Sequence, residues 1–224
     1  MNDNKTAHSS SEYDANIEKS IPYYSSIHDE VISFVSIYSL SLSKWLDTGC
    51  GTGTFVEKAR KIFTQTSFYV CDPSIEMLTM AKNKFKGEVV SLGAIDTPSL
   101  DHSWDGQFDI ITAIQCFHYL DKQGRADSIG RCFELLKKNG LFFTFENTRP
   151  LTAEGEEVFK AYWKEFQIRA GKSPDQAEAH IRRYDVEYFP ITTLEHINLL
   201  KSTGFSIVEL FWYSYMQSGY LCIK

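Results

Sequence analysis

A glycine-rich segment that joins a short apolar run to a helical stretch most strongly limits how this chain can fold. The run Ser43 to Asp47 has the pattern of a buried strand, and Phe55 to Phe63 has the apolar spacing of a helix. Between them, Gly49, Gly51 and Gly53 let the backbone turn tightly and expose N–H groups at a helix N-terminus. The segment therefore predicts the first strand, ligand loop and helix of an α/β fold.

The same alternation of strand and helix continues to about residue 146. Four further strand-like runs lie at 67–71, 88–92, 108–114 and 141–145. Because helical segments with short links separate them, including one over roughly 121–138, we expect a parallel sheet with right-handed crossovers. The runs 205–213 and 215–223 have no helix between them, so they must pair antiparallel.

The length of 224 residues fits a single domain with surplus chain around its core. We expect four parts: an N-terminal helical cover over 1–42, a ligand-binding core over 43–146, a helical insertion or lid over 150–190, and a final helix and hairpin over 192–224. An aromatic stripe in the insertion, from Val158 to Phe166, fits the core, the face of a homodimer or a lid over a substrate pocket.

Composition excludes several classes of protein. The five cysteines are an odd number without a Cys-x-x-Cys pair, which predicts a reducing, cytoplasmic setting and neither disulfides nor a zinc site. The histidines lack metal-ligand spacing, so no metal is expected. The longest apolar stretch is too short to span a bilayer. A formal net charge of −6 disfavours a nucleic-acid partner and leaves a small molecule as the expected substrate.

The register of the glycines narrows the ligand. A dinucleotide fingerprint starting at Gly49 needs glycine where Thr54 stands, and a phosphate-binding P-loop needs a lysine that is absent here. Instead, Asp47 precedes the first glycine by two positions. A carboxylate there can accept a ligand's ammonium group but would repel a pyrophosphate. The loop therefore suits an amino-acid ligand.

A second acid, Asp72, ends the next strand, where a carboxylate can accept both ribose hydroxyls of a nucleoside. An N-cap role before Pro73 is the structural alternative, and the two roles are compatible. An ammonium acceptor, close-approach glycines and a ribose acceptor together describe S-adenosylmethionine. The product of its methyl transfer is S-adenosylhomocysteine.

These motifs resemble, in order and spacing, those of class I S-adenosylmethionine-dependent methyltransferases. The matching segments are Asp47-x-Gly49-x-Gly51-x-Gly53, Asp72-Pro73-Ser74-x-x-Met77-Leu78, Phe108-Asp109-Ile110-Ile111 and Leu135-Leu136-Lys137-Lys138-x-Gly140. The resemblance implies a three-layer, Rossmann-like, seven-stranded, mostly parallel sheet with an antiparallel last strand. It implies cofactor contacts at Thr48, Gly49, Cys50, Gly51, Gly53, Pro73 and Met77, and places Ala94 and Ile95 against the adenine. Asp96 is an alternative acceptor for the adenine amino group.

A narrower resemblance is to the carboxy-S-adenosylmethionine synthase branch, linked to tRNA modification. It is carried by Lys19-Ser20-Ile21-Pro22-Tyr23-Tyr24, by Arg182-Arg183 in the insertion, and by the stretch 199–205. It implies that Tyr24 contacts the cofactor. It also implies that Arg182 or Arg183 holds the additional carboxylate of the carboxylated cofactor.

The loop after the fourth strand carries the candidates for chemistry, because it lies over the expected sulfonium. Gln115 is expected to contact the cofactor, and Cys116 to be a small core residue. His118 is either a general base or a side chain that packs the next helix. Methyl transfer to a small molecule is the favoured function; carboxyl transfer and non-catalytic cofactor binding are the alternatives.

Overall fold

Eight α-helices and eight β-strands follow one another among residues 6, 9–38 and 42–224, which the computed structural model describes. Expectations for 1–5, 7, 8 and 39–41 lie outside the described residues. The elements are α1 (Tyr13–Ser20), α2 (Tyr24–Ile37), β1 (Lys44–Thr48), α3 (Thr54–Ala59), β2 (Ser67–Cys71), α4 (Ile75–Phe85), β3 (Val90–Gly93), β4 (Phe108–Ile114), α5 (Lys122–Leu135), β5 (Leu136–Arg149), α6 (Ala153–Arg169), α7 (Pro174–Ile181), β6 (Ile191–Thr192), α8 (Thr193–Thr203), β7 (Ile207–Ser214) and β8 (Gln217–Ile223).

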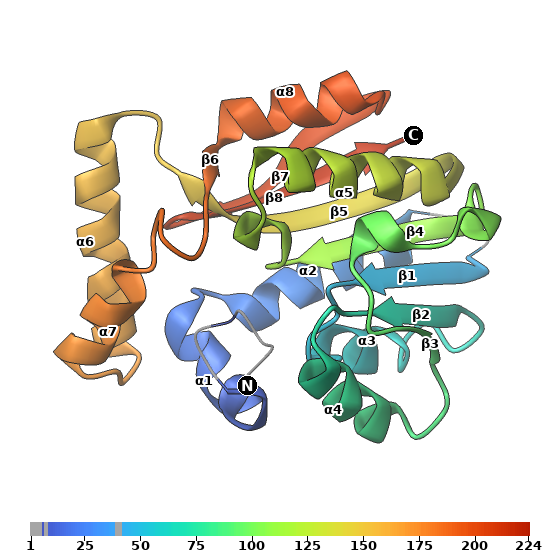
Figure 1. Cartoon of the computed structure of the whole chain (residues 1–224), viewed down its shortest axis with the longest axis horizontal. Helices are drawn as coiled ribbons and strands as arrows, with labels where there is room; N and C mark the ends of the chain where they lie inside the picture. Colours follow the sequence, from blue (N-terminus) through green and yellow to red (C-terminus); the bar gives the residue numbers. More distant parts are fainter. Residues whose placement is uncertain (1–5, 7–8, 39–41) are drawn as a thin grey trace.

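The strands form one sheet in the order β3-β2-β1-β4-β5-β8-β7, with the short β6 pairing to β5 (Figure 1). The pairs from β3 to β5 are parallel, and β8 runs antiparallel to both of its neighbours. The expected mostly parallel sheet with a reversed strand is therefore confirmed. Strand order reverses between β1 and β4, which is the position where open α/β sheets bind ligands.

Helices cover both faces of this sheet and give it three layers (Figure 1). On one face, α2, α3 and α4 bury apolar side chains against the sheet in a cluster that includes Trp45, Phe68 and Phe143. On the other face, α5 and α8 bury Ile129, Cys132 and Leu200 against Leu46, Phe142 and Cys222. The central strands β1 and β4 are buried on both faces, so the sheet holds the loops at their carboxyl ends in fixed positions.

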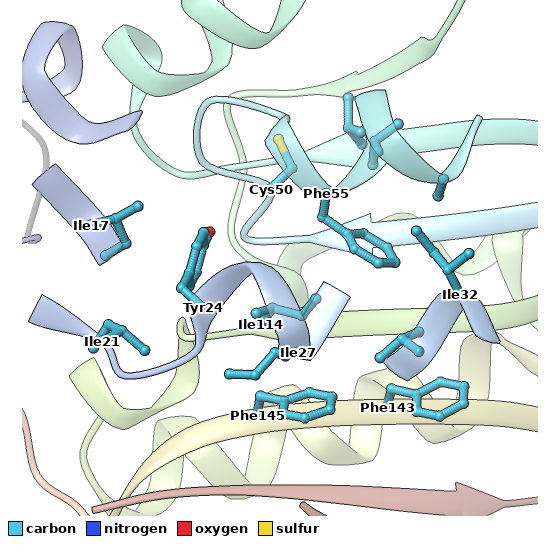
Figure 2. Close-up of a cluster of buried hydrophobic side chains, with 14 of the residues drawn as sticks. Ile17, Ile21, Tyr24, Ile27, Ile32, Cys50, Phe55, Ile114, Phe143 and Phe145 are labelled. Atoms are coloured by element: carbon cyan, nitrogen blue, oxygen red, sulfur yellow. The ribbon is translucent and has the colours of Figure 1, made fainter. Parts of the chain in front are cut away.

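The N-terminal helices α1 and α2 pack over one end of the sheet and form the N-terminal cover. α1 and α2 meet around Pro22, where Tyr23 adopts a left-handed conformation with φ 58°. In Figure 2, Ile27 of α2 lies next to the sheet residues Ile114 and Phe145, and Ile17 of α1 extends toward Tyr24. In the same view, the ring of Tyr24 extends from α2 toward the loop that carries Cys50. The cover thus closes one side of the glycine loop.

Several boundaries differ from the expected ones. The helix predicted over Phe55 to Phe63 is α3, which ends at Ala59, and the strand predicted at 88–92 spans Val90–Gly93. The helix predicted to reach residue 138 ends at Leu135, and β5 starts at once with Leu136 opposite Phe108. The Asn139-Gly140 pair that suggested a helix end instead lies inside β5, where Asn139 has a φ of 62° and the pairing with β4 shifts register. The Asn139-Gly140 turn therefore forms an irregularity within β5 and not a helix end, because residues from Leu136 onward pair with β4.

The insertion after β5 consists of α6 and α7, and it is fixed to the N-terminal cover. Ser173 caps α7 in a capping box with Gln176, as its sequence predicts. The indole N–H of Trp163 on α6 donates a 2.7 Å hydrogen bond to the carbonyl oxygen of Ser20 at the end of α1. Because Trp163 is fully buried, this bond anchors the insertion beside α1. None of the described helices is long and apolar enough to cross a membrane.

Candidate functional site

A cavity of about 240 Å³ opens at the carboxyl ends of β1, β2 and β4. Nine of the residues that the sequence singled out for cofactor contact line it: Tyr24, Asp47, Gly49, Cys50, Gly51, Asp72, Pro73, Met77 and Gln115. They come from the N-terminal cover, from the glycine loop and from three strand ends. The fold therefore brings together residues that lie far apart in the sequence.

Four other predicted contacts do not line this cavity. The Thr48 side chain is buried and hydrogen-bonds the hydroxyl of Thr97 at 2.6 Å, and Gly53 faces the ring of Phe85. A side chain at Gly53 would collide with that ring, and its φ of 77° is left-handed, so this glycine is required by packing. Ala94 and Ile95 do not line the cavity, whereas Asp96, which follows them, does. Contact between the cofactor and these four positions stays a prediction.

Asp47 is a buried carboxylate at the end of β1, only 3% exposed. Its Oδ1 accepts a 2.6 Å hydrogen bond from the hydroxyl of Thr112 on β4, and no ion pair to it forms among the described residues. Burial, opposed by the Thr112 hydrogen bond and reinforced by the charge of Asp72, raises the pKa of Asp47 to about 7. A cation in the cavity would stabilise the ionised form of this group.

Asp72 stands at the end of β2 and connects two loops. Its Oδ2 accepts the backbone N–H of Gly51 and its Oδ1 accepts the backbone N–H of Ser74, both at 2.8 Å. The hydroxyl of Ser74 in turn caps α4 through the N–H of Met77. Ser74, rather than Asp72, is thus the N-cap. The Asp72 carboxylate keeps the glycine loop and the start of α4 at the cavity wall.

The amide of Gln115 is a buried polar group whose Nε2 and Oε1 have no hydrogen-bond partner among the described residues. Gln115 is 7% exposed, follows β4 with a φ of 57°, and lines the cavity. A buried amide without partners is costly unless a ligand or water supplies them. This orphaned amide and the unpaired Asp47 carboxylate fit a ligand that brings both a cation and hydrogen-bonding groups.

The thiols near the cavity are not activated. Burial raises the pKa of Cys50 and of Cys116 well above the ordinary value, with the nearby carboxylates adding to the effect. Cys116 packs where Gly49 has no side chain: a Cβ at Gly49 would come within 2.6 Å of the Cβ of Cys116. Both cysteines therefore fill space around the loop, as their sequence context predicts.

His118 lies behind the cavity wall, in a buried polar cluster. Its ring is 1% exposed, and its Nδ1 is 2.7 Å from Oε2 of Glu146, which is fully buried at the end of β5. Glu146 also accepts the backbone N–H groups of Phe117 and His118. Burial raises the pKa of Glu146, but the hydrogen bond and charge of His118 outweigh this and leave it below its usual value. His118 is not among the residues that line the cavity.

Several lining residues were not expected from the sequence. Tyr13 on α1, Phe55 on α3 and Tyr119 after β4 complete the cavity wall. Burial raises the pKa of Tyr119 to about 12, while the neighbouring charge of Arg183 and a hydrogen bond to it oppose that rise. Apolar spacing indicated only that such aromatic residues are buried; which ones face a cavity depends on long-range packing.

The two arginines of the insertion have different surroundings. The Arg182 side chain is 76% exposed and pairs with Glu178. The Arg183 side chain is 12% exposed, pairs with Glu187, and hydrogen-bonds Tyr119. Of the two residues that the sequence left open, Arg183 is therefore the one in contact with the cavity wall.

Comparisons with known proteins agree with this architecture. A sequence profile described as a methyltransferase domain matches residues 46–142. The carboxy-S-adenosyl-L-methionine synthase of Trichodesmium erythraeum is 22% identical over 200 residues, which cover 88% of this chain and 79% of that protein. Other curated relatives carry the same name, among them one from Staphylococcus epidermidis that is 20% identical and matches 98% of this chain.

Solved structures show the same fold. The CurJ carbon methyltransferase superposes with a TM-score of 0.68 at 15% identity, covering 94% of this chain; the chain spans only 57% of that protein's length. The magnesium protoporphyrin IX methyltransferase of Synechocystis, a structure with bound S-adenosylmethionine, gives a TM-score of 0.60 at 13% identity. That match covers 89% of this chain and 78% of the other.

Proposed function

We propose that this chain is an S-adenosylmethionine-dependent methyltransferase that transfers the cofactor's methyl group to a small-molecule acceptor; the methyltransferase domain matched over residues 46–142 and the shared fold support this proposal. One observation carries the proposal. The cavity beside the glycine loop holds two buried carboxylates, Asp47 and Asp72, at the ends of adjacent parallel strands. S-Adenosylmethionine is a ligand with an ammonium group at one end and ribose hydroxyls in the middle, so it needs two such acceptors.

Asp47 is assigned to the ammonium group of the cofactor's methionine part. The carboxylate is buried without a cationic partner among the described residues, and its raised pKa reflects the cost of that isolation. An ammonium group beside it would form a charge-assisted hydrogen bond. Gln115, whose amide lacks partners, is assigned to the carboxylate or amine of the same methionine part.

Asp72 is assigned to the ribose hydroxyls and Asp96 to the adenine amino group. Both residues line the cavity, and Asp96 takes the place in the lining where Ala94 was expected. Gly49 lines the cavity with its backbone, and the space where its side chain would stand is filled by Cys116. Tyr24 closes the cavity from the N-terminal cover.

Methyl transfer from the sulfonium is an in-line displacement, in which the acceptor's lone pair forms a bond to the methyl carbon as the carbon–sulfur bond breaks. The electron pair stays on sulfur, and an acceptor that carries a proton must release it. The protein's main contribution is to position the acceptor. A cavity of about 20 Å³ next to the cofactor cavity, lined by Tyr13, Gln115, Tyr119 and Asn147, leaves room for a small reacting group.

Calorimetry with S-adenosylmethionine and S-adenosylhomocysteine tests the proposal first. We expect binding at micromolar concentrations by the wild-type chain and strong weakening in Asp47→Ala. A cell extract supplied with methyl-labelled S-adenosylmethionine should then yield a labelled small molecule with wild type only. No binding at tens of micromolar, or labelling that is equal for Asp47→Ala, would refute this function.

Carboxyl transfer is a second candidate, favoured by Arg183. The curated relatives are named carboxy-S-adenosyl-L-methionine synthases. Arg183 is nearly buried and hydrogen-bonds Tyr119, which lines the cofactor cavity, and we assign its guanidinium to a carboxylate attached to the cofactor's transferable carbon. In this reaction a carboxylic acid donor would lose carbon dioxide as its carbon–carboxyl bond breaks, and the cofactor's methyl carbon would give up a proton and bond to that carbon dioxide. The proton would end on the donor carbon, so that atoms and charge balance.

Mass spectrometry of the ligand released from the purified protein separates the two candidates. A carboxylated cofactor is heavier than S-adenosylmethionine by the mass of one carbon dioxide. Finding it in the wild-type protein, and finding S-adenosylmethionine or S-adenosylhomocysteine instead in Arg183→Gln, would favour carboxyl transfer. Arg182→Gln is the matched control, because that side chain is exposed.

A further inference from the structure

A second cavity, of about 540 Å³, lies between α1 and the turn that joins α6 to α7. We call it the α1–α7 crevice. Its wall includes Asn16 and Lys19 of α1, Lys172 of the turn, His180 of α7 and Arg183 just after α7. None of these five residues lines the cofactor cavity. The crevice is formed where the insertion meets the N-terminal cover.

Three cations from separate segments face this crevice: Lys19 of α1, Lys172 of the turn and Arg183 just after α7. The Lys19 ammonium group donates to Oδ1 of Asn16 at 3.0 Å, and the Lys172 ammonium group donates to Oε1 of Gln167 at 2.8 Å. In the part of the chain that the structure describes, neither lysine forms an ion pair with a carboxylate. The lysines on the outer side of α6 differ, because Lys160 and Lys164 each pair with a glutamate at 2.6 Å.

The positive charge in the crevice is not balanced locally. Burial lowers the pKa of Lys172 to about 8, and the charges of Arg183 and Lys19 add to this effect. Arg183 has Glu187 as its ion-pair partner, and Glu12 is the one acid in the crevice wall among the described residues. In a chain with a formal net charge of −6, such a local excess of positive charge indicates a place for an anion.

His180 separates the crevice from the small cavity that lies next to the cofactor cavity. This residue is 7% exposed and lines both the crevice and the small cavity of about 20 Å³. The small cavity in turn shares Tyr13, Gln115 and Tyr119 with the cofactor cavity. A molecule with an anionic group in the crevice would have to pass the His180 side chain to reach the transferable group of the cofactor.

We propose that the α1–α7 crevice binds a carboxylate or phosphate group of the second substrate, through Lys19 and Lys172, while the reacting part of that substrate points toward Gln115. This inference rests on the proposed function, since it names the substrate class of the same enzyme. It assigns anion binding to two lysines that are 153 positions apart in the sequence and to which the sequence analysis gave no role. The flexible ammonium groups suit either anion, because each offers three donors.

The test is calorimetry of the full-length chain saturated with S-adenosylhomocysteine, titrated at low ionic strength with inorganic phosphate and separately with succinate. We expect saturable binding of at least one anion by the wild type. Lys19→Gln and Lys172→Gln should each weaken that binding at least tenfold. Lys201→Gln, an exposed lysine on α8 at the opposite face, is the matched control and should bind as the wild type does.

Each outcome bears on the inference. Binding of phosphate alone supports it and identifies a phosphate ester, whereas binding of succinate alone supports it and identifies a carboxylic acid. No saturable binding, binding that both variants retain, or equal loss in Lys201→Gln would overturn it. Failure to bind S-adenosylhomocysteine with anion binding intact would instead count against the proposed function. Circular dichroism of each variant verifies that it is folded.

Discussion

The hydroxyl of Thr112 on β4 donates its 2.6 Å hydrogen bond to Oδ1 of Asp47 at the end of the neighbouring strand β1. Burial and the charge of Asp72 raise the pKa of the Asp47 carboxyl, and the hydrogen bond from Thr112 lowers it. The pair therefore sets how much of Asp47 is ionised near neutral pH. If Asp47 receives the cofactor's ammonium group, the pair also sets the pH dependence of binding.

Cofactor affinity should rise as pH increases through 7. In the free protein the pKa of Asp47 is about 7, and an ammonium ligand favours the ionised form, so binding at lower pH must first remove a proton. We expect affinity to fall roughly fivefold from pH 7 to pH 6 and more steeply below. Calorimetry in buffers of different ionisation enthalpy should detect proton release at pH 6. Proton uptake, or affinity independent of pH, would contradict the role of Asp47.

Removing the Thr112 hydroxyl should shift that pH dependence upward. Thr112→Val keeps the shape of the side chain but deletes the donor, so the pKa of Asp47 rises further and the midpoint of binding moves up by about 1 pH unit. Thr112→Ser keeps the hydroxyl and is the control. The measurement is S-adenosylhomocysteine affinity between pH 6 and pH 9. Identical midpoints for the two variants would show that the hydrogen bond does not tune this site.

Asp72→Asn should weaken cofactor binding well beyond the loss of one hydrogen bond. The carboxylate accepts two backbone N–H groups, from Gly51 and Ser74, and an amide nitrogen turned toward either would oppose a donor with a donor. We expect a loss of at least tenfold in affinity together with lower stability. Asp101→Asn is the control, because Asp101 accepts the N–H of Ser103 in the same local arrangement but does not line the cavity. Equal affinities in the two variants would argue against a ribose acceptor.

Local sequence signals predicted most of the fold because they act over a few residues. The strands 67–71 and 108–114 match their expected bounds, since each is an apolar run bounded by turn residues, and Thr192 and Glu195 form the capping box that their spacing indicates. The predicted helix end at Asn139-Gly140 was wrong, because the same pair of residues is compatible with a helix end and with an irregular strand.

The candidate site was predictable only where it follows the strand ends. Asp47 and Asp72 could be placed together because parallel strands end at one edge of a sheet. Tyr13 and Tyr119 could not, since their positions depend on how α1 and the insertion pack. The anion-binding crevice depends on the same packing: nothing in the sequence near Lys19 indicates that Lys172 lies beside it.

His118 is either a general base in the reaction or a buried group that stabilises the fold, and the two roles predict different effects of substitution. The ring of His118 is buried and hydrogen-bonded to Glu146. The pKa of Glu146 is lower in the folded protein than its ordinary value near 4.5, so the ionised Glu146 stabilises the fold above that pH. This contribution is lost as the pH falls through the lower folded pKa. His118→Asn should therefore lower the free energy of unfolding by about 1–3 kcal/mol at pH 7 and keep turnover within tenfold of wild type.

Urea unfolding, S-adenosylhomocysteine affinity and turnover with the acceptor that the extract identifies separate the two roles. Glu146→Ala should cost more stability, about 3–5 kcal/mol, because it leaves His118 and two backbone N–H groups buried without their partner. A structural His118 predicts that the two variants lose stability while the pH profile of turnover keeps its shape. If His118→Asn instead loses more than a hundredfold in turnover with stability and affinity retained, His118 is the base, because only proton transfer would then be missing.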